Sequence, residues 1–346
     1  MMSLLKQLTA GGLFPNKMPM TKGMDLTTSV IPKWLVSSLL LVSLGWQLPA
    51  NADLSGRELS KRIHDRLTGV PPSAAMLAAM ETAIANGADT QAGAVAAARL
   101  AIDGDNTVTA TSNFYNVTLK NWAAPWTNED DDVFVALNDY IALVIGLVSG
   151  EEDFRQLLGG NIMYVGVSGS LPAYSMTDNN HYEQLEDSGA NLGDSSVLVQ
   201  RQQSDVMDLP EAAVAGIFST RAAGEAFFIE GTNRAMLRFT LRNHLCNDLE
   251  QLKDTELPAH RIRQDVSRSP GGDSRLFLNG CVGCHSGMDP LAQAFAYYQY
   301  EYTGEEENPI GGRIVYTPGV VQEKYLINGG SFKEGFITPN DSWTNH

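Results

Sequence analysis

One stretch of the sequence places two cysteines, a histidine and an aspartate close together: Cys281-Val282-Gly283-Cys284-His285-Ser286-Gly287-Met288-Asp289-Pro290-Leu291. Two residues separate the cysteines, so a single helical turn presents both sulfur atoms on one face. His285 lies four residues after Cys281 and therefore falls on the same side of that turn. The spacing predicts a helical site that holds one group through two thiols and one imidazole.

C-x-x-C-H is the attachment pattern of haem c. In such a site the two thiols add across two vinyl groups of the porphyrin, and the imidazole becomes the proximal ligand of the iron. We expect Cys281 and Cys284 to be the thioether anchors of one covalent haem c and His285 to be its iron ligand. Gly283, which has no side chain, is expected to let the ring approach the backbone. The single motif predicts a single haem, which disfavours a di-haem peroxidase.

Two other uses of paired cysteines fit the sequence less well. A thioredoxin-like dithiol needs a preceding strand within a βαβ unit, and the flanking sequence predicts neither the strand nor the βαβ unit. A zinc site needs two further ligands at short spacing, and the chain has no second C-x-x-C. Cys246 is the one remaining cysteine, so the chain is also no disulfide scaffold.

The sequence does not determine the sixth ligand of the iron. The last methionine, Met288, is three residues past His285 and is expected on the proximal side. An iron with an open sixth position is the alternative to a protein ligand. The remaining candidate donors are Met207, Met236, His244, His260 and the terminal His346, of which Met236 and His244 share one predicted helix.

Composition excludes some partners. The 346 residues are 43% hydrophobic and 18% charged, which is typical of a globular chain, and the formal net charge is −16. A chain this acidic has no broad basic face for nucleic acid. We expect instead a redox partner protein with a basic docking surface, with plain solubility as the alternative reason for the acidity.

The N-terminal 52 residues are expected to be a targeting segment. Lys33 precedes an apolar run over 34–44, and Ala50-Asn51-Ala52 provides a cleavage site after Ala52. Residues 1–23 make this signal unusually long, so a start at Met24 is an alternative, and an uncleaved anchor is another. With no further apolar run long enough to span a bilayer, the mature protein is expected to have no membrane span and to be periplasmic or extracellular.

The remaining sequence predicts a mostly α fold. A helical N-terminal region is expected over 53–205 and a helical, haem-bearing region with little strand over 206–346. The acidic run 129–132 is expected to cap a helix over 133–148, since it lacks the ligand spacing of an EF-hand. Residues 166–193 are expected to be a loop with a solvated His181. Further helices are expected over 54–67, 73–87, 92–102, 153–158, 210–218, 233–252 and 291–300, and a strand over 313–316.

The motif region is similar to a known family. Residues 281–291 resemble the C-x-x-C-H-x-x-[IM]-D-P-x-G signature of planctomycete-type exported cytochromes, which surround single haem c sites with domains of unknown function. Residues 62–73 resemble the family's R-x-x-x-x-L-T-G-x-P-P-[ST] segment, and 218–246, with Arg234, resemble the helical stretch before its haem. The chain departs from the family at Leu276-Phe277-Leu278, where a histidine is usual, and at Leu291, where glycine is usual. Family chains continue past the haem segment, which raises the alternative that this one is truncated after His346.

The sequence therefore predicts an exported monohaem c-type cytochrome that transfers electrons. A haem enzyme with an open iron, peroxidase-like or oxygenase-like, is the alternative, and a scaffold that uses haem for stability is a third. Met288, Asp289 and Pro290 are expected to shape the haem edge. The aromatic residues expected near the porphyrin, with a place in the ordinary core as the alternative, are Phe295, Tyr297, Tyr298 and Tyr300.

Overall fold

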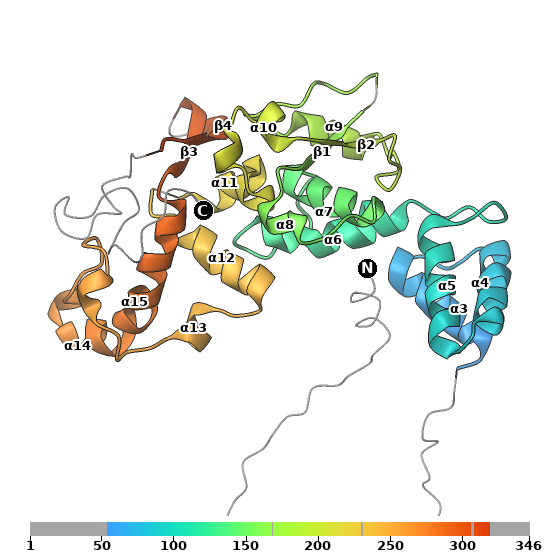
Figure 1. Ribbon diagram of the computed structural model, residues 1–346, viewed down its shortest axis with the longest axis horizontal. Helices are drawn as coiled ribbons and strands as arrows, with labels where there is room; N and C mark the ends of the chain where they lie inside the picture. Colours follow the sequence, from blue (N-terminus) through green and yellow to red (C-terminus); the bar gives the residue numbers. More distant parts are fainter. Residues whose placement is uncertain (1–53, 168, 230, 306–307, 319–346) are drawn as a thin grey trace, which may run out of the picture. The chain divides into compact units, whose positions relative to one another are not determined.

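The computed structural model describes residues 54–167, 169–229, 231–305 and 308–318 (Figure 1). Of the described residues, 54% are helical and 9% are in strands, so the predicted mostly α fold is confirmed. The described chain divides into two compact units, one of residues 54–66 and 71–109, the other of residues 67–70 and the described residues between 110 and 318. The predicted targeting segment 1–52 and His346 lie outside the described residues.

The predicted division at 205/206 falls inside the second unit. The buried Gln203 side chain donates a hydrogen bond to the carbonyl of Gly216 and accepts one from the Ser219 hydroxyl. Buried polar groups need such partners, so the chain on both sides of 205 is joined in one core.

The first unit is built from α3 (Gly56–Thr68), α4 (Ala74–Asn86) and α5 (Thr90–Asp103). Ser73 caps α4, because its hydroxyl accepts a hydrogen bond from the amide of Met76. Small residues bring α4 and α5 together: a methyl group at Gly93 would lie 2.6 Å from the carbonyl oxygen of Ile84. The many small residues in this part of the sequence therefore allow the two helices to pack closely.

The second unit contains two antiparallel strand pairs: β1 (Met163–Gly166) with β2 (Leu198–Arg201), and β3 (Tyr298–Glu305) with β4 (Asn308–Tyr316). Short 3₁₀ and π-helical turns join its helices. Its helices are α6 (Lys120–Ala123), α7 (Asp139–Ser149), α8 (Gln156–Gly159), α9 (Asn180–Asp187), α10 (Gln203–Val206), α11 (Arg221–Phe227), α12 (Arg234–Leu245), α13 (Leu249–Leu252), α14 (Ser274–Leu276) and α15 (Val282–Leu291).

Helix α7 forms the centre of the second unit. Every residue from 139 to 147 is buried, and the helix packs against α6, α8, α11 and β1 (Figure 1). It begins later than predicted because Asn138, not the acidic run, caps it: the Asn138 side chain accepts a hydrogen bond from the amide of Ile141. The acidic run acts locally instead, with Asp131 paired to Arg242 and Asp132 accepting from the amide of Phe134.

The predicted solvated loop over 166–193 contains helix α9, and His181 lies buried in it. Its Nε2 accepts a hydrogen bond from the amide of Gly166 at 3.0 Å, and its Nδ1 lies 2.8 Å from the carbonyl oxygen of Pro172. The prediction of a solvated His181 is wrong, because the backbone of this Gly- and Asn-rich segment supplies both partners.

The predicted helices over 233–252 and 291–300 are also corrected. The first is two helices, because Cys246 adopts a left-handed backbone conformation (φ 56°) that ends α12, and Asp248 caps α13. The second is wrong beyond Phe295, where Tyr298 begins strand β3. The strand expected over 313–316 is confirmed as part of β4.

Candidate functional site

The C-x-x-C-H motif lies within one continuous helical segment. Asp273 caps α14, a π-helical turn covers Phe277–Cys281, and α15 follows at Val282. π-helical turns insert one residue into the helix and occur frequently at functional sites. Cys281 and Cys284 are free, partly exposed thiols three residues apart on this segment, as the spacing predicts.

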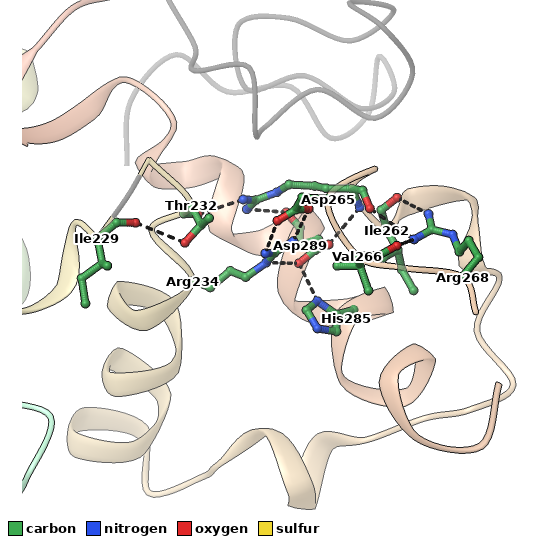
Figure 2. Close-up of polar contacts among 10 residues, drawn as sticks. Ile229, Thr232, Arg234, Ile262, Asp265, Val266, Arg268, His285 and Asp289 are labelled. Atoms are coloured by element: carbon green, nitrogen blue, oxygen red, sulfur yellow. Dashed lines mark hydrogen bonds and ion pairs between the residues drawn. The ribbon is translucent and has the colours of Figure 1, made fainter. Parts of the chain in front are cut away.

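His285 is oriented by a buried carboxylate one turn further along α15. Its Nδ1 lies 3.1 Å from Oδ1 of Asp289, whose side chain is fully buried, while the imidazole is 23% exposed (Figure 2). No described residue makes a hydrogen bond to its Nε2. A histidine that binds a metal through one ring nitrogen usually donates its other N–H to such a carboxylate.

Asp289 is ionised despite its burial. Burial raises its pKa, but hydrogen bonds from His285 and Arg234 and the charges of Arg263 and Arg234 outweigh that effect and hold the pKa well below its ordinary value. An ionised carboxylate only accepts hydrogen bonds, so Nδ1 of His285 must be the donor. In the neutral tautomer that donates from Nδ1, the lone pair lies on Nε2.

Two arginines from distant parts of the chain complete this cluster. Arg234, the first residue of α12, donates from Nε to Oδ1 of Asp289 at 2.8 Å and from Nη2 to Oδ2 at 3.1 Å. It also pairs with Asp265, as Figure 2 shows. The fully buried Arg263 donates its backbone amide to Oδ2 of Asp289 at 2.9 Å and its guanidinium to the carbonyl of Thr232.

The segment that directly follows α13 covers Gly283. A methyl group there would lie 2.7 Å from Cγ of Lys253, and the amide of Asp254 donates to the Gly283 carbonyl at 3.0 Å. The lack of a side chain at Gly283 therefore leaves room for Lys253 of this segment. The thiol of Cys284 faces the carbonyl oxygen of Leu249 on α13 at 3.9 Å.

Apolar side chains surround the motif. Ile262, Phe277 and Val282 form a buried cluster against which Cys281 packs. Six leucines on α12 to α15 and the segments between them are each 42–57% exposed: Leu245, Leu252, Leu257, Leu276, Leu278 and Leu291. Exposed apolar side chains are common on protein surfaces, and these are free to contact a ligand or partner.

Most candidates for the sixth ligand are engaged elsewhere. Met236 and His244 lie in an aromatic cluster with Trp126, Tyr140 and Phe218, and Nε2 of His244 is 2.8 Å from the Tyr140 hydroxyl. Met207 is buried. His260 is exposed on the 3₁₀ turn Ala259–Arg261, which packs against α15.

The four aromatic residues expected near the porphyrin make core contacts. Phe295 packs against Phe218 and Phe228, Tyr298 stacks on Phe228, and the Tyr298 hydroxyl donates to the carbonyl of Ala213. Tyr297 packs against Tyr316, and Tyr300 lies beside Arg221. These are the contacts of ordinary core aromatic residues, which was the alternative expectation for them.

Comparison with known proteins gives no relative: no family model, curated protein or solved structure matches the chain. Across the described residues, no helix is both long and apolar enough to cross a bilayer. In the same residues, no three His, Cys, Asp or Glu side chains gather as a ligand set for a metal ion. A haem iron needs few protein ligands because the porphyrin supplies four, so that last finding concerns zinc-type sites.

The residues present fit a covalently attached haem. Two free thiols stand one turn apart and partly exposed, and the next residue is an imidazole whose Nδ1 is oriented by Asp289 and whose Nε2 has no hydrogen-bond partner among the described residues. Sequence reasoning identified the thiols and the imidazole but missed the partners Arg234, Arg263 and Asp265. The spacing His285-x-x-x-Asp289 was the available signal for the carboxylate, because residues four apart meet on a helix.

Proposed function

We propose that this chain is an exported monohaem c-type cytochrome that transfers electrons, with Cys281 and Cys284 as thioether anchors and His285 as proximal ligand. One observation carries the proposal. The residue after the second of two free thiols is an imidazole whose Nδ1 is held by a buried carboxylate and whose Nε2 makes no hydrogen bond to any residue that the structure describes.

The residues of the chain have distinct tasks in this proposal. Asp289 accepts the Nδ1–H of His285 and so fixes both the ring orientation and the tautomer that offers Nε2. Arg234 and the backbone of Arg263 hold Asp289 in place. The bound haem supplies a one-electron couple. Exposed leucines on the motif's own helical segment, Leu276, Leu278 and Leu291, would contact its apolar faces and exclude water.

Covalent attachment is the first test. The exported chain, produced with a haem c attachment system, should keep its haem on a denaturing gel stained for haem peroxidase activity. Replacing Cys281 and Cys284 with Ala should abolish the stain, because both thioether bonds are lost. Cys246→Ala is the matched control, since this exposed cysteine lies outside the motif, and it should stain as the wild type does. Loss of haem from the denatured wild type would refute the proposal.

Export through the segment 1–52 is part of the same proposal, because haem c is attached outside the cytoplasm and Ala50-Asn51-Ala52 fits a cleavage site. The family resemblance and the acidic charge support a soluble electron carrier that docks with a basic partner. The intact mass of the exported protein should correspond to a chain that begins at Asp53. A mass that retains residues 34–48 would favour a membrane anchor instead.

An enzyme with an open iron is a second candidate, favoured by the engagement of His244 with Tyr140 and the burial of Met236 among aromatic rings. Carbon monoxide distinguishes the two functions. A carrier with two protein ligands should bind it slowly or not at all, whereas an open iron should bind it fast and tightly. If His260 blocks the sixth position, His260→Ala should convert slow binding into fast binding. Met236→Ala and His244→Ala serve as comparisons.

A further inference from the structure

We propose that Asp289 and Arg234 together set the reduction potential of the iron, acting through His285. Asp289 lowers the potential and Arg234 raises it. This inference rests on the proposed haem attachment. Both are positioning residues, because they act through His285.

The geometry connects the two residues to the same atom. Oδ1 of Asp289 accepts from Nδ1 of His285 at 3.1 Å and from Nε of Arg234 at 2.8 Å. The carboxylate is fully buried and the Arg234 side chain is 17% exposed, so water screens their interaction little. His285 therefore shares its acceptor with a guanidinium.

The two contacts act on the imidazole in opposite directions. A carboxylate that accepts the Nδ1–H increases the basicity of the ring, and a more basic ligand favours ferric over ferrous iron. Arg234 draws charge from the same oxygen and adds a positive charge nearby, which weakens that pull and favours ferrous iron. A buried carboxylate without this arginine would lower the potential further.

The test is a redox titration of the mature haem-bearing protein, followed by its optical spectrum. Asp289→Asn should raise the midpoint potential, because the amide is a weaker acceptor and carries no charge. Arg234→Gln should lower it. Opposite shifts from two residues in direct contact are not expected if the cluster only stabilises the fold.

Two matched controls separate the contact with His285 from simple loss of charge. Asp265→Asn removes the other carboxylate that pairs with Arg234, but Asp265 makes no bond to His285. Arg238→Gln removes the same charge one turn along α12, where the guanidinium pairs with Asp248. Both controls should shift the potential less than the corresponding test variant. Where the reduced iron has an open sixth position, its iron–histidine stretching band should move to lower frequency in Asp289→Asn and stay in place in Asp265→Asn.

Each outcome decides the inference. If Asp289→Asn does not fold, the sign of the Arg234→Gln shift alone decides it: a lower potential supports it, and an unchanged or higher potential overturns it. Equal shifts in Asp289→Asn and Asp265→Asn would also overturn it. Failure of the wild type to hold covalent haem would overturn the proposed function itself, whereas haem with unchanged potentials would overturn only this inference.

Discussion

His244 shows how burial decides the charge state of one side chain. It is half-buried among Trp126, Tyr140 and Phe218, and burial lowers its pKa to about 4. Burial also raises the pKa of Tyr140 well above its ordinary value, so the phenol stays protonated. Tyr140 therefore donates to Nε2 of a neutral His244, and a protonated imidazole would lose this bond.

Acid should destabilise the protein through His244. The unfolded chain takes up the proton near pH 6.5 and the folded chain only near pH 4, so the unfolded state binds more protons between these values. The free energy of unfolding should fall by about 2–3 kcal/mol as the pH is lowered from 7 to 4. Urea unfolding at several pH values measures this. His244→Gln should remove that part of the pH dependence, whereas exposed His260→Gln should retain it. The same acid slope in His244→Gln would contradict the assignment.

The sequence predicts the residues of the candidate site whose roles depend on neighbours within one helical turn. The spacing of Cys281, Cys284 and His285 fixes their chemistry within one turn, so these residues could be predicted. Asp289 was expected only to shape the haem edge. Arg234 is 55 residues from it in the chain and Arg263 is 26, and no local pattern brings such residues together. Their role depends on the packing of α12 and α15.

Helix α7 shows the same limit for an element. The apolar sequence of α7 predicts a buried helix. However, the Asn138 cap determines where the helix begins, and Gly146 determines how closely it packs against β1. A methyl group at Gly146 would lie 2.2 Å from the ring of Tyr164 on β1. Likewise, the break at Cys246 depends on one left-handed residue, and strand β3 on pairing with β4. Periodicity identifies helices but not such stops.

Gly146→Ala should destabilise the protein although alanine is the better helix former. Overpacking in a close-packed core costs about 1–3 kcal/mol, more than the roughly 1 kcal/mol that helix propensity returns. Gly159→Ala is the control, because nothing lies within 4 Å of the position of its added methyl group in α8. Thermal unfolding should show a lower Tm for Gly146→Ala and an equal or higher Tm for Gly159→Ala. Equal effects would mean that the approach of Tyr164 is not tight.

The charge of the whole chain acts over distances that no single contact covers. A net charge of −16 creates a negative potential around the molecule, and salt screens it within about 10 Å at 0.1 M. The structure shows ion pairs, such as Arg238 with Asp248, that neutralise charge locally. The excess of acidic residues leaves the field negative, which favours the approach of cationic partners and is the physical basis for the basic partner proposed here.

Electron exchange should therefore depend on salt with a sign set by the charge of the partner. Oxidation of the reduced haem protein by the hexaammineruthenium(III) cation should slow by roughly tenfold when the ionic strength is raised from about 10 mM to about 0.5 M, because attraction is screened. Oxidation by the hexacyanoferrate(III) anion should accelerate over the same range. Stopped-flow absorbance measures both rates on one preparation, so each oxidant serves as the control for the other. If both rates changed in the same direction, the net charge would not govern approach to the haem, and a local patch of the opposite sign would have to surround its exposed edge.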